Sequence, residues 1–244
     1  MPLTGRHCLP PEHFLMPPLP LQIPSIFIFT TLLTFWFVFR AIRNAGYTST
    51  RDMAPRFVIL ALIWLVGQAI LGLTGFYTDT SGVPPRTIWL ILPPLLVIMA
   101  LFIASKQFVE RVSAETLTYL HIVRLPVEIG LFWLAQQKLI PEEMTFSGHN
   151  FDIIMGLTSP IIAYFGYTQT RLFKPFLLGW NVIGLVFLLI IVAHGILALP
   201  SVLQMYAFEQ PNRAMLYFPF LWLPSFIVPS VLFAHLACIR QLIK

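Results

Sequence analysis

Residues 175–199 read PFLLGWNVIGLVFLLIIVAHGILAL and contain no aspartate, glutamate, lysine or arginine. A helix rises 1.5 Å per residue, so about 20 such residues cross the roughly 30 Å hydrocarbon core of a bilayer. Backbone N–H and C=O groups cannot stay unpaired in lipid, and a helix pairs them within one segment. This stretch therefore predicts a membrane-spanning helix.

Six further apolar stretches of similar length indicate the same structure, at 22–41, 56–77, 87–105, 114–136, 151–169 and 216–241. Hydrophobic residues make up 57% of the 244 positions and charged residues 10%, whereas soluble domains carry about a quarter charged residues. We therefore expect an all-α polytopic membrane protein with seven transmembrane helices. Residues 22–244 would form a single domain, preceded by a Pro-rich extracytoplasmic segment, 1–21.

The positive charges predict how these helices are oriented. Ten of the 15 Lys and Arg residues fall on one side of the predicted topology, namely Arg40, Arg43, Arg51, Arg56, Lys106, Arg111, Arg171, Lys174, Arg240 and Lys244. Cytoplasmic loops carry such an excess, so the N-terminus is expected outside the cell membrane and the C-terminus in the cytoplasm. The basic loops then face anionic lipid, and we expect the lipid bilayer, not nucleic acid, as their partner.

Short matches recur in the same order in the two halves of the chain. They are Thr30-Thr31 with Thr158-Ser159, Gln68–Leu73 with His194–Leu199, Pro84–Arg86 with Pro211–Arg213, and Leu92-Pro93 with Leu223-Pro224. The matches predict a duplication, with residues 22–108 as the first repeat, 151–241 as the second and 109–138 as a linker helix. Three spans end on the side opposite their start, so a parallel second copy needs one extra helix. The result is a 3+1+3 bundle whose repeats are related by an axis along the membrane normal.

This 3+1+3 arrangement resembles the SWEET or PQ-loop transporters in topology. The Pro-Gln pairs that name the group are absent from the first and fifth spans, where Pro24 and Pro160 stand at other places. The resemblance implies an architecture and alternating access between the repeats, and it carries no sugar substrate to this chain.

The fourth span holds the most polar side chains of the predicted membrane region. Thr118, His121, Arg124 and Glu128 are spaced by three or four residues, which places them on one helix face. A charge at the bilayer centre costs at least about 2.5–3.5 kcal/mol, so Arg124 and Glu128 should face the bundle interior or water. Two interpretations stay open: an ion pair between residues four apart, or a substrate or proton site.

A second polar cluster lies in the outer approach to the fifth span and contains Thr145, Ser147, His149, Asn150 and Asp152. Asn150 would cap the helix and Asp152 would complement its positive N-terminal dipole. Alternatively, this outer polar cluster borders a pocket open to the outside, because Gln68 and His194 are expected at similar depths. The predicted substrate-binding residues are therefore His121, Arg124, Glu128, Gln68 and His194.

The histidines allow two cofactor alternatives. His121 and His235 are expected in the inner half and His149 and His194 in the outer half, a distribution that a di-haem cytochrome b could use. A metal-dependent hydrolase could use Glu128, His149, Asp152 and His194, but no HExxH or HxxxH spacing occurs. We predict no metal site, and the sequence specifies neither a cofactor nor catalytic residues.

The composition, the short loops and the polar fourth span together favour a small-molecule carrier or ligand-binding membrane bundle. The pocket would surround the fourth helix, and rocking of one repeat against the other would move a small-molecule ligand. A membrane-embedded enzyme or b-type haem redox subunit is the first alternative. A structural subunit of an oligomer or larger membrane complex is the second.

Overall fold

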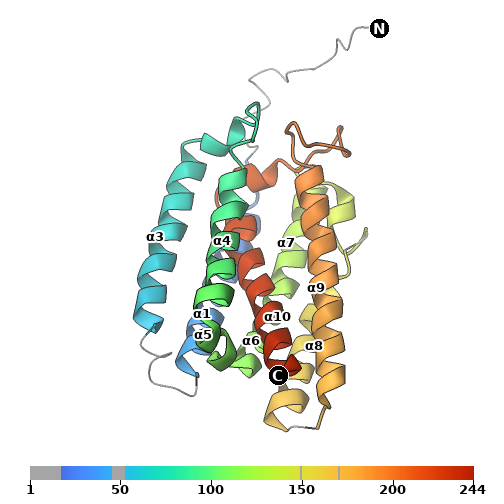
Figure 1. Ribbon diagram of the computed structural model, residues 1–244. Coiled ribbons are helices and arrows are strands. Elements are labelled where there is room, and N and C mark those ends of the chain that lie inside the picture. The colour runs from blue at the N-terminus through green and yellow to red at the C-terminus, as the bar shows by residue number, and fades with distance from the viewer. Residues whose placement is uncertain (1–17, 46–52, 149, 170) are drawn as a thin grey trace, which may run out of the picture.

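The computed structural model describes residues 18–45, 53–148, 150–169 and 171–244. These four ranges are all-helical: 73% of the described residues lie in helices and none lies in a strand. The long helices run side by side along a common direction (Figure 1). The fold is therefore a helical bundle.

In the described ranges, five helices are long and apolar enough to cross a membrane: α1 (Gln22–Arg43), α3 (Ala54–Leu73), the continuous helix Ala114–Gln136, α9 (Lys174–Leu197) and the continuous helix Leu223–Ile243. The third of these consists of α6 (Ala114–Leu120), the 3-10 turn η3 (His121–Val123) and α7 (Arg124–Gln136). The fifth consists of a π turn, η7 (Leu223–Ile227), and α10 (Val228–Ile243).

The remaining helices are shorter. They are α4 (Ile88–Ala104), α5 (Lys106–Arg111) and α8 (Asp152–Ala163), which continues into a π turn, η5 (Tyr164–Thr168). Short 3-10 turns, η2 (Phe76–Thr78), η4 (Glu142–Met144) and η6 (Ala214–Leu216), lie in the connecting segments.

Large apolar side chains cover the outside of the bundle. Examples on four different helices are Phe29, Ile63, Ile103 and Ile183, each more than half exposed. Soluble monomers rarely expose contiguous apolar surface beyond a few hundred Å². Long apolar helices with an apolar outer surface are the features of a membrane protein.

The C-terminal helix occupies the middle of the bundle. α10 packs along α9 and α6 and also contacts α4 and α5, and it carries the fully buried side chains of Ala234, His235 and Cys238. Its C-terminal end lies beside α5 and α6, at the end of the bundle opposite the loops that follow α3 and α9 (Figure 1). A side chain on α10 therefore reaches the interior from the centre of the fold.

Two prolines free backbone carbonyls that side chains then satisfy. Pro160 has no N–H for the carbonyl of Gly156, and the Ser159 hydroxyl donates to that carbonyl instead, at 3.0 Å. Pro229 likewise frees the carbonyl of Ser225, and the indole N–H of Trp64 on α3 donates to it at 2.9 Å. Inside a bilayer no water would satisfy these carbonyls, so each needs a partner within the protein. The second bond also joins α3 to the last helix.

The last helix begins later than the predicted span 216–241. Regular helix starts near Leu223, after the η6 turn and further turns at 217–221. Pro219 and Pro224 lack backbone donors, so this approach cannot form an uninterrupted α-helix. The π turn at Leu223–Ile227 absorbs the second interruption, and such turns often occur at functional sites.

Candidate functional site

A buried ion pair joins the first residues of α7 and α8. Arg124 Nη1 lies 2.8 Å from Asp152 Oδ1, and both side chains are almost fully buried. An uncompensated charge in this position would be strongly destabilising, so each group requires the other. Among the ion pairs of the described residues, none involves Glu128, although it lies one helical turn from Arg124.

The same guanidinium fixes the tautomer of a histidine on α10. Arg124 Nη2 lies 2.9 Å from His235 Nε2, and because arginine only donates, His235 Nε2 accepts. The neutral ring then carries its proton on Nδ1, which donates to Asn181 Oδ1 on α9 at 3.0 Å. Four helices, α7, α8, α9 and α10, are thus joined by one set of buried polar contacts.

His121 extends this set by ring contact alone. Its ring stacks on His235 with centroids 4.0 Å apart and planes inclined by 27°. Trp180 meets the His121 ring edge-on at 5.4 Å and lies 5.8 Å from the His235 ring. The ring is fully buried, and neither of its nitrogens has a hydrogen-bond partner in the described part of the chain. Positive charge on either ring would be opposed by burial and by the nearby guanidinium of Arg124, so the stack suits neutral imidazoles.

Gly184 makes room for the histidine on α10. A methyl group at this position would lie 2.4 Å from Met155 Cε and 2.5 Å from His235 Cε1. α9 can therefore approach the ring of His235 only because residue 184 has no side chain.

Glu128 is held by the loop that leads into α8. Asn150 Nδ2 donates to Glu128 Oε1 and, at 3.2 Å, to the carbonyl of Met144. Asn150 Oδ1 accepts the N–H of Asp152, the first residue of α8, at 3.0 Å. The N-cap position itself is Phe151, which makes no side-chain cap bond, so the expected capping by Asn150 is wrong in position. Among the described residues Glu128 Oε2 has no hydrogen-bond partner, although the backbone N–H of Phe146 lies near the carboxyl.

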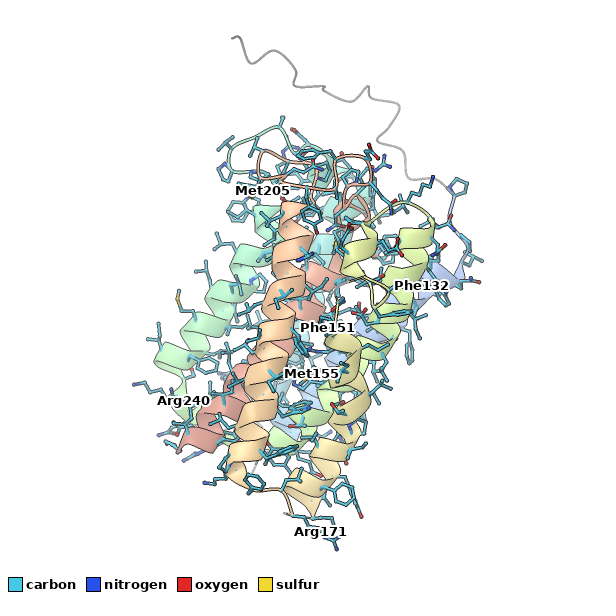
Figure 2. The ribbon with its side chains drawn as sticks, turned by 90° about the vertical axis from the view of Figure 1, so that its right-hand side faces the viewer. Phe132, Phe151, Met155, Arg171, Met205 and Arg240 are labelled. Carbon is cyan, nitrogen blue, oxygen red and sulfur yellow. The ribbon has the colours of Figure 1, made fainter. Side chains whose placement is uncertain are left out.

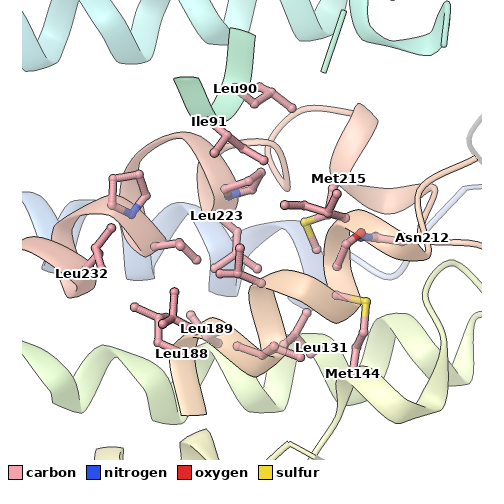
Figure 3. A pocket seen from close by; sticks show the side chains of 18 of the residues that line it. Leu90, Ile91, Leu131, Met144, Leu188, Leu189, Asn212, Met215, Leu223 and Leu232 are labelled. Carbon is pink, nitrogen blue, oxygen red and sulfur yellow. The ribbon is translucent and has the colours of Figure 1, made fainter. Parts of the chain in front are cut away.

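A cavity of about 190 Å³ adjoins this carboxyl (Figure 3). Its wall is formed by α4, α7, α9 and the η7–α10 segment, and the side chains are mostly leucine, isoleucine, valine and methionine. The polar side chains on the wall are Thr87, Glu128, Asp152 and Asn212. Asn212 Nδ2 donates to the carbonyl of Gly195 at 3.0 Å, while its buried Oδ1 finds no partner in the part of the chain that the structure describes.

The structure brings some of the proposed site residues together and separates others. Glu128 borders the cavity, and Asn150 and Asp152 contact the same polar cluster as His121 and Arg124. Gln68 lies elsewhere, on α3, where its Oε1 accepts from the Tyr77 hydroxyl at 2.7 Å.

One proposed histidine lies apart from this cluster. His194, near the end of α9, places its ring 5.6 Å from that of Tyr206. His149 lies outside the described residues.

Asn181 in the polar cluster and Asn212 on the cavity wall were not among the proposed site residues. His235 was considered only as a haem ligand. Asn181 is an isolated polar residue in the apolar sequence of α9, and that isolation is a signal for a buried contact. Asn212 lies in a loop, where an asparagine has no such meaning. His235 was expected to share a depth with His121, and in the structure the two rings touch, which leaves no gap for a haem between them.

Within the described ranges, no three His, Cys, Asp or Glu side chains gather as the ligands of a metal ion would. Comparison of the chain with protein families, curated proteins and solved structures finds no match in any of the three. The fold and the site define a helical bundle with the features of a membrane protein and with a buried polar cluster beside an apolar cavity.

Proposed function

We propose that this protein is a seven-span membrane carrier or ligand-binding bundle that holds a small molecule in the cavity between α4, α7, α9 and α10. One observation carries the proposal: a mostly apolar cavity is lined by Glu128, a buried carboxyl whose Oε2 has no hydrogen-bond partner among the described residues. Binding sites for small molecules are typically apolar pockets with few polar groups that fix orientation. Buried polar atoms are otherwise nearly always satisfied.

The seven spans would comprise the five long helices, α4, and α8 with its π turn. α4 has 17 residues, the lower end of the length that crosses a bilayer. α8 has 12 residues and the π turn that continues it has five. Arg171 and Arg240 lie toward the end of the bundle opposite Met205 (Figure 2), which supports a cytoplasmic C-terminus under the positive-inside rule.

Proline positions around the cavity support a carrier that changes shape. Pro224 and Pro229 line the cavity, and Pro93 and Pro94 interrupt α4 beside the lining residues Ile91 and Leu95. Local rearrangement of these helices would change the shape of the cavity without unfolding the bundle. Such movement would serve the rocking of the two proposed repeats, 22–108 and 151–241.

The two proposed repeats differ in their internal packing. α9 and α10 pack closely, whereas α3 and α4 make few direct contacts. The duplication therefore remains a proposal, carried by the matches in sequence.

A membrane enzyme is the second candidate, because Glu128 and Asp152 both reach the wall of the same cavity. Two carboxyl groups in different surroundings, one paired with Arg124 and one without a cation, are a common basis for acid–base chemistry. A turnover assay on any molecule that binds the cavity separates the enzyme from the carrier.

The proposal is tested by filling the cavity. Val192 lines the cavity, whereas Ile190 on the same helix is 43% exposed on the outside. Protein purified in lipid nanodiscs should release a co-purified small molecule on solvent extraction, detected by mass spectrometry. Val192→Trp should lose that molecule and Ile190→Trp should keep it. Equal retention by two folded variants would overturn the proposal.

A further inference from the structure

The walls of the cavity differ in their exposure. At the end near the loops that follow α3 and α9, the lining residues are buried: Thr87, Met144, Leu199, Asn212 and Met215. Figure 3 shows Met144, Asn212 and Met215 gathered at one end of the pocket. A molecule from the aqueous phase would have to displace this layer.

The side of the cavity between α4 and α9 has more exposed lining residues than the buried end. Leu95 on α4 and Leu189 on α9 both line it, and they are 38% and 53% exposed. The cavity wall therefore reaches the apolar outside of the bundle between these two helices, which face each other across α10 in Figure 1. In a membrane this outside is in contact with lipid tails.

The polar groups on the wall restrict the chemistry of an occupant. Arg124 is already paired with Asp152, and in the described residues no cation pairs with Glu128. An unpaired ionised carboxylate in an apolar cavity is very costly, so a neutral carboxylic acid suits this position. A neutral carboxyl both donates and accepts, and the partnerless Asn212 Oδ1 can only accept.

A hydroxyl group fits these requirements better than an ammonium group. It accepts a hydrogen bond from a neutral carboxyl and donates one to an oxygen. An ammonium group beside Glu128 would also lie near the guanidinium of Arg124 and be repelled by it.

The volume limits how much of the molecule is enclosed. An apolar cavity of about 150 Å³ holds benzene, so about 190 Å³ holds a ring or a short chain. A longer molecule would extend between α4 and α9.

We propose that the occupant is a lipid-soluble alcohol that enters laterally from the bilayer between α4 and α9 and places its hydroxyl group against Glu128. This inference rests on the proposed binding function and adds to it the class of the ligand and its route. The apolar body of the alcohol would replace lipid contacts with the leucine-rich wall, and only its hydroxyl would require a polar partner.

The test uses the full chain in phosphatidylcholine nanodiscs and a photoreactive long-chain alcohol carrying a diazirine. Labelled peptides are mapped by mass spectrometry. The alcohol should label α4, α9 and α10, and unlabelled alcohol should compete about tenfold better than the alkane or the methyl ether of equal length, as expected for one buried hydrogen bond. Better competition by the amine of equal length, or equal competition by the methyl ether, would overturn the alcohol class.

Three variants complete the test. Glu128→Met should lower labelling about tenfold, and Asn150→Ala, which frees Glu128 Oε1 and leaves Oε2 in place, should retain labelling if it remains folded. Leu95→Trp should slow labelling by alcohol supplied in the lipid, whereas Val97→Trp, on the exposed side of α4, should not. Unchanged labelling in folded Glu128→Met overturns the hydroxyl contact, and unchanged labelling in Leu95→Trp overturns the lateral route.

The two proposals fail in different ways. If the alcohol does not label the cavity while Val192→Trp still loses a co-purified molecule, the binding function stands and the alcohol class is wrong. If the cavity-filling variant loses nothing and the alcohol does not label, both are wrong.

Discussion

Arg124 forms its ion pair with Asp152, 28 residues further along the chain, and not with Glu128, which lies one helical turn away. The alternative of an ion pair between residues 124 and 128 is therefore not what the structure shows. The guanidinium is directed toward α8 and α10. The Glu128 side chain instead accepts a hydrogen bond from Asn150, in the loop before α8, and lines the cavity. The two carboxyl groups nearest to Arg124 thus have different surroundings.

We expect the pair to behave as a unit in stability. Arg124→Met or Asp152→Leu alone should lower the free energy of unfolding by about 3–5 kcal/mol, because each strands a buried charge. The double variant, Arg124→Met with Asp152→Leu, should recover most of this loss. About 1–3 kcal/mol should remain lost, because His235 Nε2 no longer receives a hydrogen bond from Arg124. Thermal unfolding in detergent measures the coupling, and additive losses would contradict the pairing.

Gly184 provides a test of the close approach of α9 to His235. Gly184→Ala should cost about 1–3 kcal/mol, because the new methyl group forces His235 and Met155 to move. Gly179→Ala, in the same helix with nothing within 4 Å of its new methyl group, should be neutral or stabilising by up to about 1 kcal/mol. Equal effects of the two substitutions on thermal unfolding would show that this contact is not made.

The bond between Trp64 and the carbonyl of Ser225 should be measurable. Trp64→Phe removes the donor and leaves that carbonyl without its bond at a proline interruption, so we expect a loss of about 1–3 kcal/mol. Trp89→Phe is the matched control, since its side chain is 54% exposed. Trp64→Phe should destabilise the protein clearly more than Trp89→Phe in the same unfolding assay.

Orientation is checked by labelling introduced cysteines in intact cells. With Cys8 replaced by serine and Cys238 buried, a cysteine introduced at Asp79 or Glu143 should react with an impermeant maleimide. One introduced at Lys106 or Arg171 should react only after the membrane is opened. All four positions are exposed at the surface, so labelling of position 106 in sealed cells would reverse the proposed orientation.

The contact between α5 and the C-terminus should depend on pH. Hydrogen bonds from Lys244 and Arg240 hold the pKa of Glu110 below its ordinary value of 4.5. Because the pKa of Glu110 is lower in the folded protein, this contact stabilises the fold fully at pH values above the ordinary pKa. The stabilisation is lost as the pH falls through the pKa that Glu110 has in the folded protein. The protection of residues 240–244 against hydrogen exchange, corrected for the intrinsic exchange rate at each pH, should therefore fall at acid pH in the native protein. Glu110→Gln should remove most of that pH dependence.

The helices could be predicted from sequence because length and hydrophobicity determine them locally. The stretch containing Trp180 has no charged residue for more than 20 positions, and it forms α9 as expected. The last span was placed too early because a hydropathy pattern does not register prolines such as Pro219. The polar fourth helix was also expected, since the spacing of His121, Arg124 and Glu128 is a local property.

The partners of these side chains could not be predicted. His235 reaches Arg124 and Asn181 only through the packing of α7, α9 and α10, and no local pattern encodes which faces meet. The same applies to Gln68, whose predicted pocket position depended on an assumed alignment of repeats. Its observed partner, Tyr77, is only nine residues away.

The order of the buried polar groups along the chain bears on how the protein is made. Arg124 leaves the ribosome 28 residues before Asp152 and 111 residues before His235. We expect the helix Ala114–Gln136 to enter the membrane before the ion-pair partner of Arg124 has been made, and a charge at the centre of a single membrane helix costs at least about 2.5–3.5 kcal/mol. Its stable integration is coupled to the arrival of α8, so a nascent chain arrested before Asp152 should remain exposed to the translocation machinery or to quality-control proteases.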